Sequence, residues 1–131
     1  MNIEFTRRSS NSAYPTLYAE NLYINNVLAT RVEIPEGIST IANFLFYNNT
    51  NITEVILPDS VTSIGERAFK GCTSITAIPI SDNITSIGDY AFEGCTGLTD
   101  ITLPSSITTI ESGAFSSCTG LTEVALPDSV T

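Results

Sequence analysis

The chain has 131 residues, of which 42% are hydrophobic, and its mean hydropathy is +0.18. This length and apolar content fit one folded domain and argue against a disordered chain. The formal net charge is −9, and residues 71–131 carry seven acidic residues but no lysine or arginine. Nucleic acid and anionic membrane surfaces both require a cationic partner, so we expect neither to bind this chain.

The N-terminal part, residues 1–29, lacks the regularity of the rest. Residues 1–13 are polar and without a period, and we expect a loose N-terminal arm there. No apolar run approaches the ~18 residues of a membrane span or follows the signal-peptide pattern, so membrane insertion is not expected. Residues 14–29, YPTLYAENLYINNVLA, place apolar residues on both sides of Asn25-Asn26, which predicts a hairpin. We expect this hairpin to cap the first coil of the array that follows.

From residue 30 onward the chain consists of successive copies of one sequence pattern. The copy at residues 98–120 reads LTDITLPSSITTIESGAFSSCTG, and the two copies before it have the same length and follow the same pattern without a slip in register. The predicted repeat array, residues 30–131, consists of a degenerate copy (30–51), three full copies (52–74, 75–97 and 98–120) and a partial copy (121–131).

Each copy has three parts. In the first, LTxIxLP, apolar residues such as Ile101 alternate along a predicted strand that ends at Pro104. The second, SITTI, is a short extended segment that ends at Ile110. In the third, ESGAFSSCTG, the spacing of Ala114, Phe115 and Cys118 predicts one or two turns of helix.

The copies must stack on one another. The apolar side chains of one copy cannot offset the conformational entropy lost by ordering its backbone, so a single copy cannot fold alone. Stacking places equivalent residues in inward columns, and the strands, which all enter their coils in one direction, form a parallel sheet. The predicted columns are Ile64, Ile87, Ile110; Phe69, Phe92, Phe115; and Val55, Ile78, Ile101, Val124.

The pattern LxxIxLPxSVTxIGxxAFxxC resembles the BspA-type leucine-rich repeat, a variety with the same repeat length that is found in bacterial surface proteins. The resemblance covers about residues 30–131. It implies a β-rich α/β repeat solenoid: a right-handed coil with a parallel sheet on one face and short helical or 3-10 turns on the other. It also implies a role in adhesion or protein binding and a cell-surface or secreted location. The asparagine usual in leucine-rich repeats is kept at Asn83 and replaced by serine at Ser60, Ser106 and Ser129.

Catalytic and metal-binding patterns are weak. The chain has no histidine, and its three cysteines, Cys72, Cys95 and Cys118, are each one full repeat apart rather than in a close pair. We expect them to be buried structural thiols in one column with Asn49. No nucleotide-binding or hydrolase motif is present, so we predict no enzyme activity, no metal site and no cofactor.

The outward positions of the predicted strands form the candidate binding face. Side chains on a stacked sheet are aligned on a rigid backbone, which favours ligand binding. The leading hypothesis is a non-catalytic protein-interaction or adhesion module, with a spacer segment of a larger surface protein and a carbohydrate-binding module as alternatives. Self-association through the open edge of the partial last copy is a further expectation. The candidate partner-binding residues are Arg31, Glu33, Glu54, Ile56, Asp100, Thr102 and Glu123.

Overall fold

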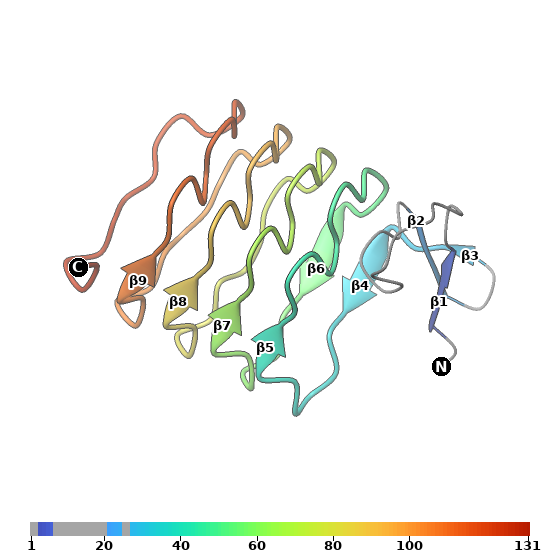
Figure 1. The fold of residues 1–131 in the computed structure, drawn as a ribbon, viewed down its shortest axis with the longest axis horizontal. Coiled ribbons are helices and arrows are strands. Elements are labelled where there is room, and N and C mark those ends of the chain that lie inside the picture. The colour runs from blue at the N-terminus through green and yellow to red at the C-terminus, as the bar shows by residue number, and fades with distance from the viewer. Residues whose placement is uncertain (1–2, 7–20, 25–26) are drawn as a thin grey trace.

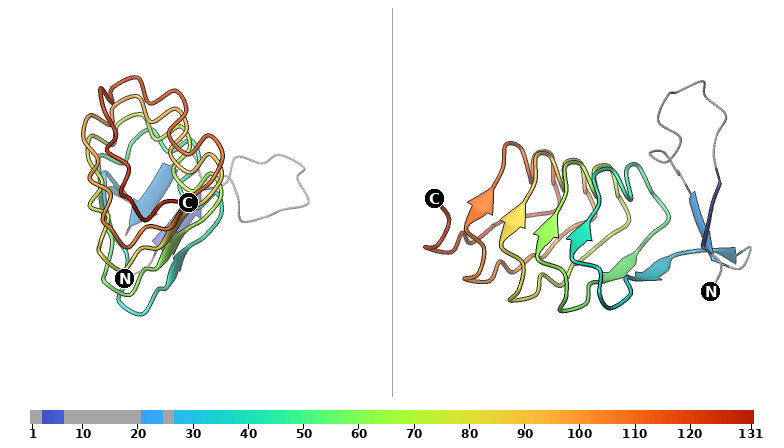
Figure 2. Two further views of the ribbon diagram at one scale, coloured as in Figure 1. Left: turned by 90° about the vertical axis from the view of Figure 1, so that its left-hand side faces the viewer. Right: turned by 60° about the horizontal axis from the view of Figure 1, so that its bottom comes forward.

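The structure, a computed structural model, describes residues 3–6, 21–24 and 27–131 and shows flattened coils stacked side by side (Figure 1). Viewed along the stack, successive coils superimpose (Figure 2). Equivalent residues of neighbouring repeats pair directly, as Ile41 does with Ile64 and Ile64 with Ile87. One sequence repeat is therefore one turn of the solenoid, and the predicted fold class is confirmed.

An antiparallel sheet lies at the N-terminal end of the stack, beyond β4 (Figure 1). It contains β1 (Ile3–Thr6), β2 (Asn21–Ile24) and β3 (Val27–Leu28) in that order. Strands β2 and β3 pair as the predicted hairpin does, while its Asn25-Asn26 turn and residues 14–20 lie outside the described residues. Residues 3–6 belong to a strand rather than to a loose arm. The capping role of this sheet stays a prediction.

The first part of each repeat forms strands in the first two coils. Strand β4 (Arg31–Glu33) pairs in parallel with β6 (Glu54–Ile56), but the next two coils share a single bridge between Ala77 and Asp100. The parallel pairing predicted for the first repeat part is therefore present in the first two coils and is reduced to one bridge further along the stack. Pro79 occupies, one coil later, the last position of β6, and proline has no N–H to donate to the preceding strand.

The second part of each repeat forms the continuous sheet, which we call the second ladder. Its strands are parallel, and each places an isoleucine inward and a serine or threonine outward. The sequence predicted only an extended segment here. In spatial order the strands are β5 (Thr40–Ile41), β7 (Ser63–Ile64), β8 (Ser86–Ile87) and β9 (Thr109–Ile110).

The third part of each repeat contains no helix in the described residues, which corrects the predicted helical turns. Every second N–H group from Ala68 to Cys72 donates to the carbonyl three residues earlier in its own coil, as in a turn. The N–H groups of Arg67, Phe69 and Gly71 instead donate to carbonyls of the next coil, at 2.8–2.9 Å. A helix needs an unbroken series of bonds along its own chain, so these segments are tandem turns. We call residues 42–49, 65–72, 88–95 and 111–118 the turn tier.

Left-handed backbone explains why the turn tier is not helical. Two positions in each coil have φ between 50° and 75°, where each turn ends and the chain changes direction. Such a conformation costs a side chain-bearing residue about 1–2 kcal/mol, and the bonds to the next coil maintain it. The two columns are Phe44, Arg67, Tyr90 and Gly113, and Asn48, Gly71, Gly94 and Ser117.

Inward columns form the core as predicted. The rings of Phe46, Phe69, Phe92 and Phe115 stack in succession, with centroids 5.2, 5.3 and 5.4 Å apart. Phe69 and Phe92 are at most 1% exposed, whereas Phe115 is half-buried because it has a ring neighbour on one side only. The core is therefore continuous along the stack and less well covered at its C-terminal end.

The cysteines are free and buried, as the sequence predicted. Each thiol donates to the carbonyl of a phenylalanine in the preceding coil, at 3.0–3.1 Å. Burial raises the pKa of Cys72 to about 12 and also raises the pKa values of Cys95 and Cys118. In the same column, Asn49 is 1% exposed, and its Oδ1 accepts bonds from the N–H groups of Asn51 and Ile52.

Candidate functional site

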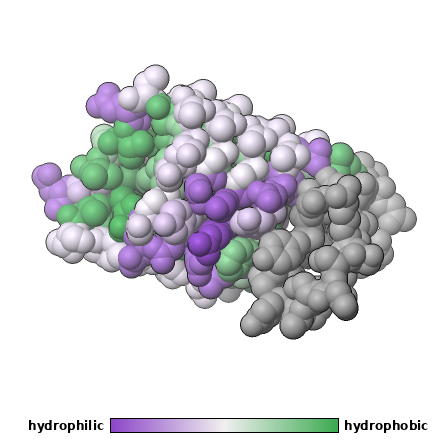
Figure 3. Space-filling view, turned by 45° about the horizontal axis from the view of Figure 1, so that its top comes forward, coloured by the Kyte–Doolittle hydropathy of each residue, from purple (hydrophilic) through white to green (hydrophobic). Residues whose placement is uncertain are grey.

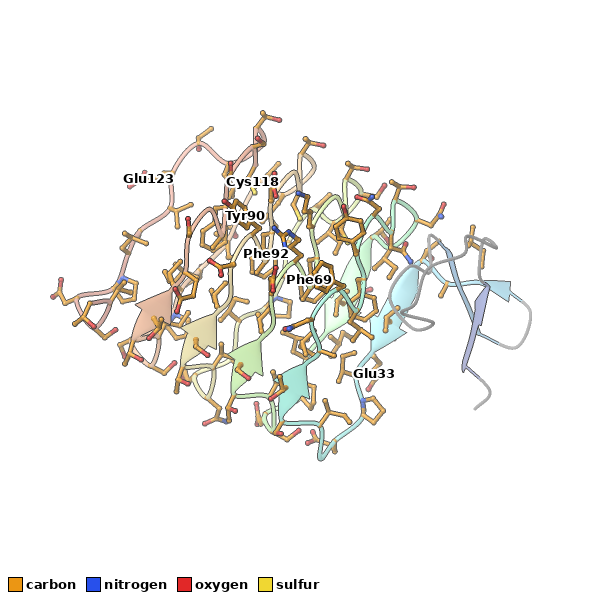
Figure 4. The ribbon with its side chains drawn as sticks, in the orientation of Figure 1. Glu33, Phe69, Tyr90, Phe92, Cys118 and Glu123 are labelled. Atoms are coloured by element: carbon orange, nitrogen blue, oxygen red, sulfur yellow. The ribbon has the colours of Figure 1, made fainter. Side chains whose placement is uncertain are left out.

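The outward residues of the first repeat part form the strand face. In the first two coils the sheet register places Arg31 beside Glu54 and Glu33 beside Ile56. Glu33 and Glu123 lie at opposite ends of the stack (Figure 4). The strand face comprises the column Arg31, Glu54, Ala77, Asp100 and Glu123 and the column Glu33, Ile56, Pro79, Thr102 and Ala125.

The structure brings most of the predicted binding residues into register but not all of them. Asp100 is joined to the preceding coil by its bridge to Ala77, and both Asp100 and Thr102 are exposed. Glu123 is exposed too, yet the described part of its coil contains no strand or bridge. It belongs to the face by repeat position alone.

Charge is unevenly distributed along the strand face. Arg31 lies 3.0 Å from Glu54 and 3.8 Å from Glu33, and all three side chains are more than half exposed. Such exposed pairs add little stability, and one arginine offsets only one of the two glutamates, which leaves the strand face of the first two coils with a net charge of −1. Asp100 and Glu123 have no ion pair within the described part of the chain, so the face becomes more acidic toward its C-terminal end.

Hollows lie along this face between neighbouring coils, and the described residues line the two considered below. The first hollow, about 530 Å³, lies at the ends of β4 and β6, and the second, about 280 Å³, lies two coils further on. Sequence reasoning identified Glu33, Ile56, Asp100 and Thr102 but missed the corner residues around them. The first hollow is lined by Glu33, Ile34, Pro35, Glu36, Ile56, Leu57, Pro58 and Asp59; the second by Ala77, Ile78, Pro79, Ile80, Asp100, Ile101 and Thr102.

The described residues bring together no three acidic, cysteine or histidine side chains that could hold a metal ion. The thiols are held in their protonated form by burial, which makes them poor nucleophiles. No helix in the part of the chain that the structure describes is long and apolar enough to cross a membrane.

Hydrophobic surface gathers at the C-terminal end of the stack (Figure 3). Leu126 is 61% exposed, and Leu121 and Val124 are half-buried. This is the end where the sequence predicted an open edge.

A family comparison decides which repeat this is. Residues 18–131 match the BspA type leucine rich repeat region as six copies. The chain belongs to this family. BspA-type proteins and their structural neighbours are generally non-catalytic repeat proteins, and the family points to a protein-interaction or scaffold role.

Solved leucine-rich repeat proteins have the same architecture as this BspA-type array. A protein from Bacteroides ovatus is 37% identical with a TM-score of 0.73, over 80% of this chain and 27% of that protein. One from Bacteroides capillosus is 31% identical with a TM-score of 0.68, over 83% of this chain and 82% of that one. A third, from T. pallidum, is 28% identical with a TM-score of 0.66, over 75% of this chain and 59% of that protein. No curated protein matches the chain by sequence.

Proposed function

We propose that this BspA-type array is a non-catalytic protein-interaction module that binds its ligand on the strand face. The observation that carries the proposal is the alignment of outward side chains in successive coils, such as Arg31 with Glu54 and Ala77 with Asp100. The continuous second ladder and the stacked core hold these positions, so a ligand meets an ordered surface and few side chains need to be immobilised on binding.

The chemistry of the face favours a protein ligand with basic and apolar groups. Acidic residues at both ends, Glu54 and Glu123 among them, flank small or apolar residues such as Ala77 and Pro79. Charge complementarity steers a basic partner to such a surface, and the apolar positions supply contact area. The family resemblance supports an adhesion role and a cell-surface or secreted location for this module.

Peptide selection followed by matched charge reversal tests the proposal. Peptides are first selected from a random display library on the wild-type protein and then measured on two variants. Asp100→Lys with Glu123→Lys alters the strand face, while Asp89→Lys with Glu111→Lys makes the same charge change at exposed positions of the turn tier. We expect the first variant to lose binding and the second to retain it, with both melting temperatures close to wild type.

Equal loss in the two variants would mean that peptides respond only to net charge. Selection of no peptide would favour the spacer alternative, and a glycan array probed with the same protein tests the carbohydrate alternative.

Self-association is a second proposal, supported by the apolar end of the stack. Leu126 is the most exposed large hydrophobic residue in the described part of the chain. Leu126→Lys should abolish any rise in molecular mass with concentration measured by light scattering. A wild-type protein that stays monomeric at high concentration would contradict the proposal.

A further inference from the structure

We propose that the first hollow is a subsite for a lysine or arginine side chain of an extended partner segment. This inference rests on the proposed function, because it assigns a ligand chemistry to one place on the strand face. It commits to a basic residue rather than to a purely apolar one, and three features of the hollow support that choice.

The walls of the hollow are apolar. Pro35 and Pro58, which follow the strand segments of the two coils, line it together with the half-buried Ile56. These groups offer a surface of carbon atoms to whatever enters. The methylene stem of lysine or arginine packs on such a surface while its charged end stays near water.

The rim of the hollow is acidic. Glu33, Glu36 and Asp59 line it, and all three are exposed. Three acidic residues among the eight that line one hollow favour a cationic ligand over an acidic one. A partner side chain with an apolar stem and a cationic end satisfies both the walls and the rim.

Of the three acidic lining residues, Glu33 is the one that pairs with a described cation, Arg31. Arg31 is 3.8 Å from Glu33, but its Nε donates to Glu54 at 3.0 Å on the other column of the face. Glu36 and Asp59 make no ion pair with any described residue. None of the described lysine and arginine side chains therefore pairs with Glu36 or Asp59.

The other described cations are engaged elsewhere. Lys70 pairs with Glu93 at 2.6 Å, and Arg67 pairs with Glu66. The Arg67 guanidinium also lies between the rings of Phe44 and Tyr90, 5.7 and 5.1 Å from their centroids. Both side chains belong to the turn tier, so neither pairs with the acidic residues of the first hollow.

The second hollow provides a comparison within the same face. It is about half as large, at 280 Å³ against 530 Å³, and Asp100 is its one carboxylate. Pro79 and Ile80 line it where charged groups line the first hollow. Basic specificity should therefore be confined to the first hollow, with apolar contacts favoured at the second.

Methyl NMR with a defined probe tests the inference. The probe is a blocked synthetic hexapeptide with lysine between two valines, compared with versions carrying norleucine or glutamate in place of lysine. Titration of the lysine peptide into isoleucine-labelled protein should shift the methyl signals of Ile34 and Ile56, at the first hollow, more than those of Ile80 and Ile101, at the second. The norleucine and glutamate peptides should shift them much less.

Charge-neutral variants separate local recognition from overall attraction. Glu36→Gln with Asp59→Asn should weaken the lysine peptide about five- to tenfold, the effect of two exposed ionic contacts. Asp82→Asn with Asp128→Asn removes the same charge from equivalent corners of other coils and should leave affinity within about twofold.

Equal binding of the norleucine peptide, or equal weakening by both variants, would overturn the inference. The same experiments distinguish this inference from the proposed function. If the selected ligands depend on Asp100 and Glu123 but not on Glu36 and Asp59, the strand face remains the binding site and this subsite is rejected. If the lysine peptide shifts the Ile56 signal but charge reversal at Asp100 and Glu123 leaves the selected ligands unaffected, the subsite is retained and the proposed function of the strand face is rejected.

Discussion

Backbone pairing between coils is continuous on one side of the solenoid and interrupted on the other. On one side the second ladder runs unbroken through β5, β7, β8 and β9, and the turn tier adds three bonds from each coil to the next. On the strand face, β4 and β6 pair, but the next coils share one bridge. Backbone bonds on one side therefore hold the stack together, and the strand face tolerates residues such as Pro79 that a continuous sheet would not.

The side with continuous pairing stabilises the stack, while the side with interrupted pairing varies in sequence. The second ladder repeats nearly the same pair, Thr-Ile or Ser-Ile, in each strand, whereas the outward strand-face column changes from Arg31 to Glu54 to Ala77. A surface that contributes few backbone bonds can change its side chains at little cost to the fold. The following predictions test that division, beginning with the largest expected effect.

Removing one ring from the stacked core should destabilise the protein most. Phe92→Ala leaves a cavity between two stacked neighbours and should lower the free energy of unfolding by about 3–5 kcal/mol. Phe115→Ala, at a half-buried ring with one stacked neighbour, is the matched control and should cost clearly less. Urea denaturation measures both, and equal losses would show that stacking on both sides does not matter.

Alkaline pH should destabilise the thiol column. The pKa of Cys72 is raised from 9.0 in the unfolded chain to about 12, and that of Cys95 is raised as well. The folded state keeps these protons, so their stabilisation is complete below pH 9 and is lost as pH rises toward 12. At pH 10 the two thiols together should cost about 3 kcal/mol relative to pH 7.

The matched variant for the thiols is Cys95→Ala. In urea unfolding it should lose about half as much stability as wild type between pH 7 and pH 10. An identical pH dependence in the two proteins would exclude the thiols as its cause.

Backbone strain in the turn tier can be tested at Gly94. Its φ is +70°, and a Cβ there would come no closer than 3.9 Å to a neighbouring coil, so a substitution meets strain without a clash. Gly94→Val should cost about 2 kcal/mol, because β-branched residues avoid this region. Gly94→Asn should cost about 1 kcal/mol or less, since Asn48 adopts φ 55° in the same column. Similar melting temperatures would argue against the left-handed conformation.

The smallest effect is expected on the strand face itself. Pro79→Ile restores the N–H group that β6 has at the equivalent position, and total stability should change by about 1 kcal/mol or less because the new bond offsets the entropy gained by the unfolded chain. Hydrogen exchange reports the result directly: the amide of residue 79 should be protected. Exchange at the rate of a free amide would mean that proline does not cause the break in the sheet.

Much of the architecture could be predicted from the repeat, because periodicity alone fixes which residues share a column. The inward positions of Ile64, Phe69 and Cys72 are examples, and all three are at most 2% exposed. The turn tier could not be predicted in the same way. Phe44, Arg67 and Tyr90 adopt a left-handed backbone conformation that is rare for such residues. The sequence pattern therefore predicted a helix instead. The other left-handed column, with Gly71, Gly94 and Asn48, was the available signal.

The candidate site could be predicted in part. Alternation along the strands identified outward residues such as Glu54 and Asp100, which are exposed as expected. The hollows depend on how the corners of neighbouring coils are spaced, which a linear pattern does not contain. Glu36 and Asp59 were therefore missed, although each follows a proline that ends its strand segment.

The bonds between coils also set how the molecule responds to force. In the turn tier and the second ladder they run from one coil to the next, along the axis of the stack. Tension applied between the two ends loads the bonds of one coil at a time, so the array should peel open rather than shear as a unit. Each released coil would add roughly 75 Å of extended chain. An array built in this way should yield in equal steps and shorten again as each coil refolds on its neighbour.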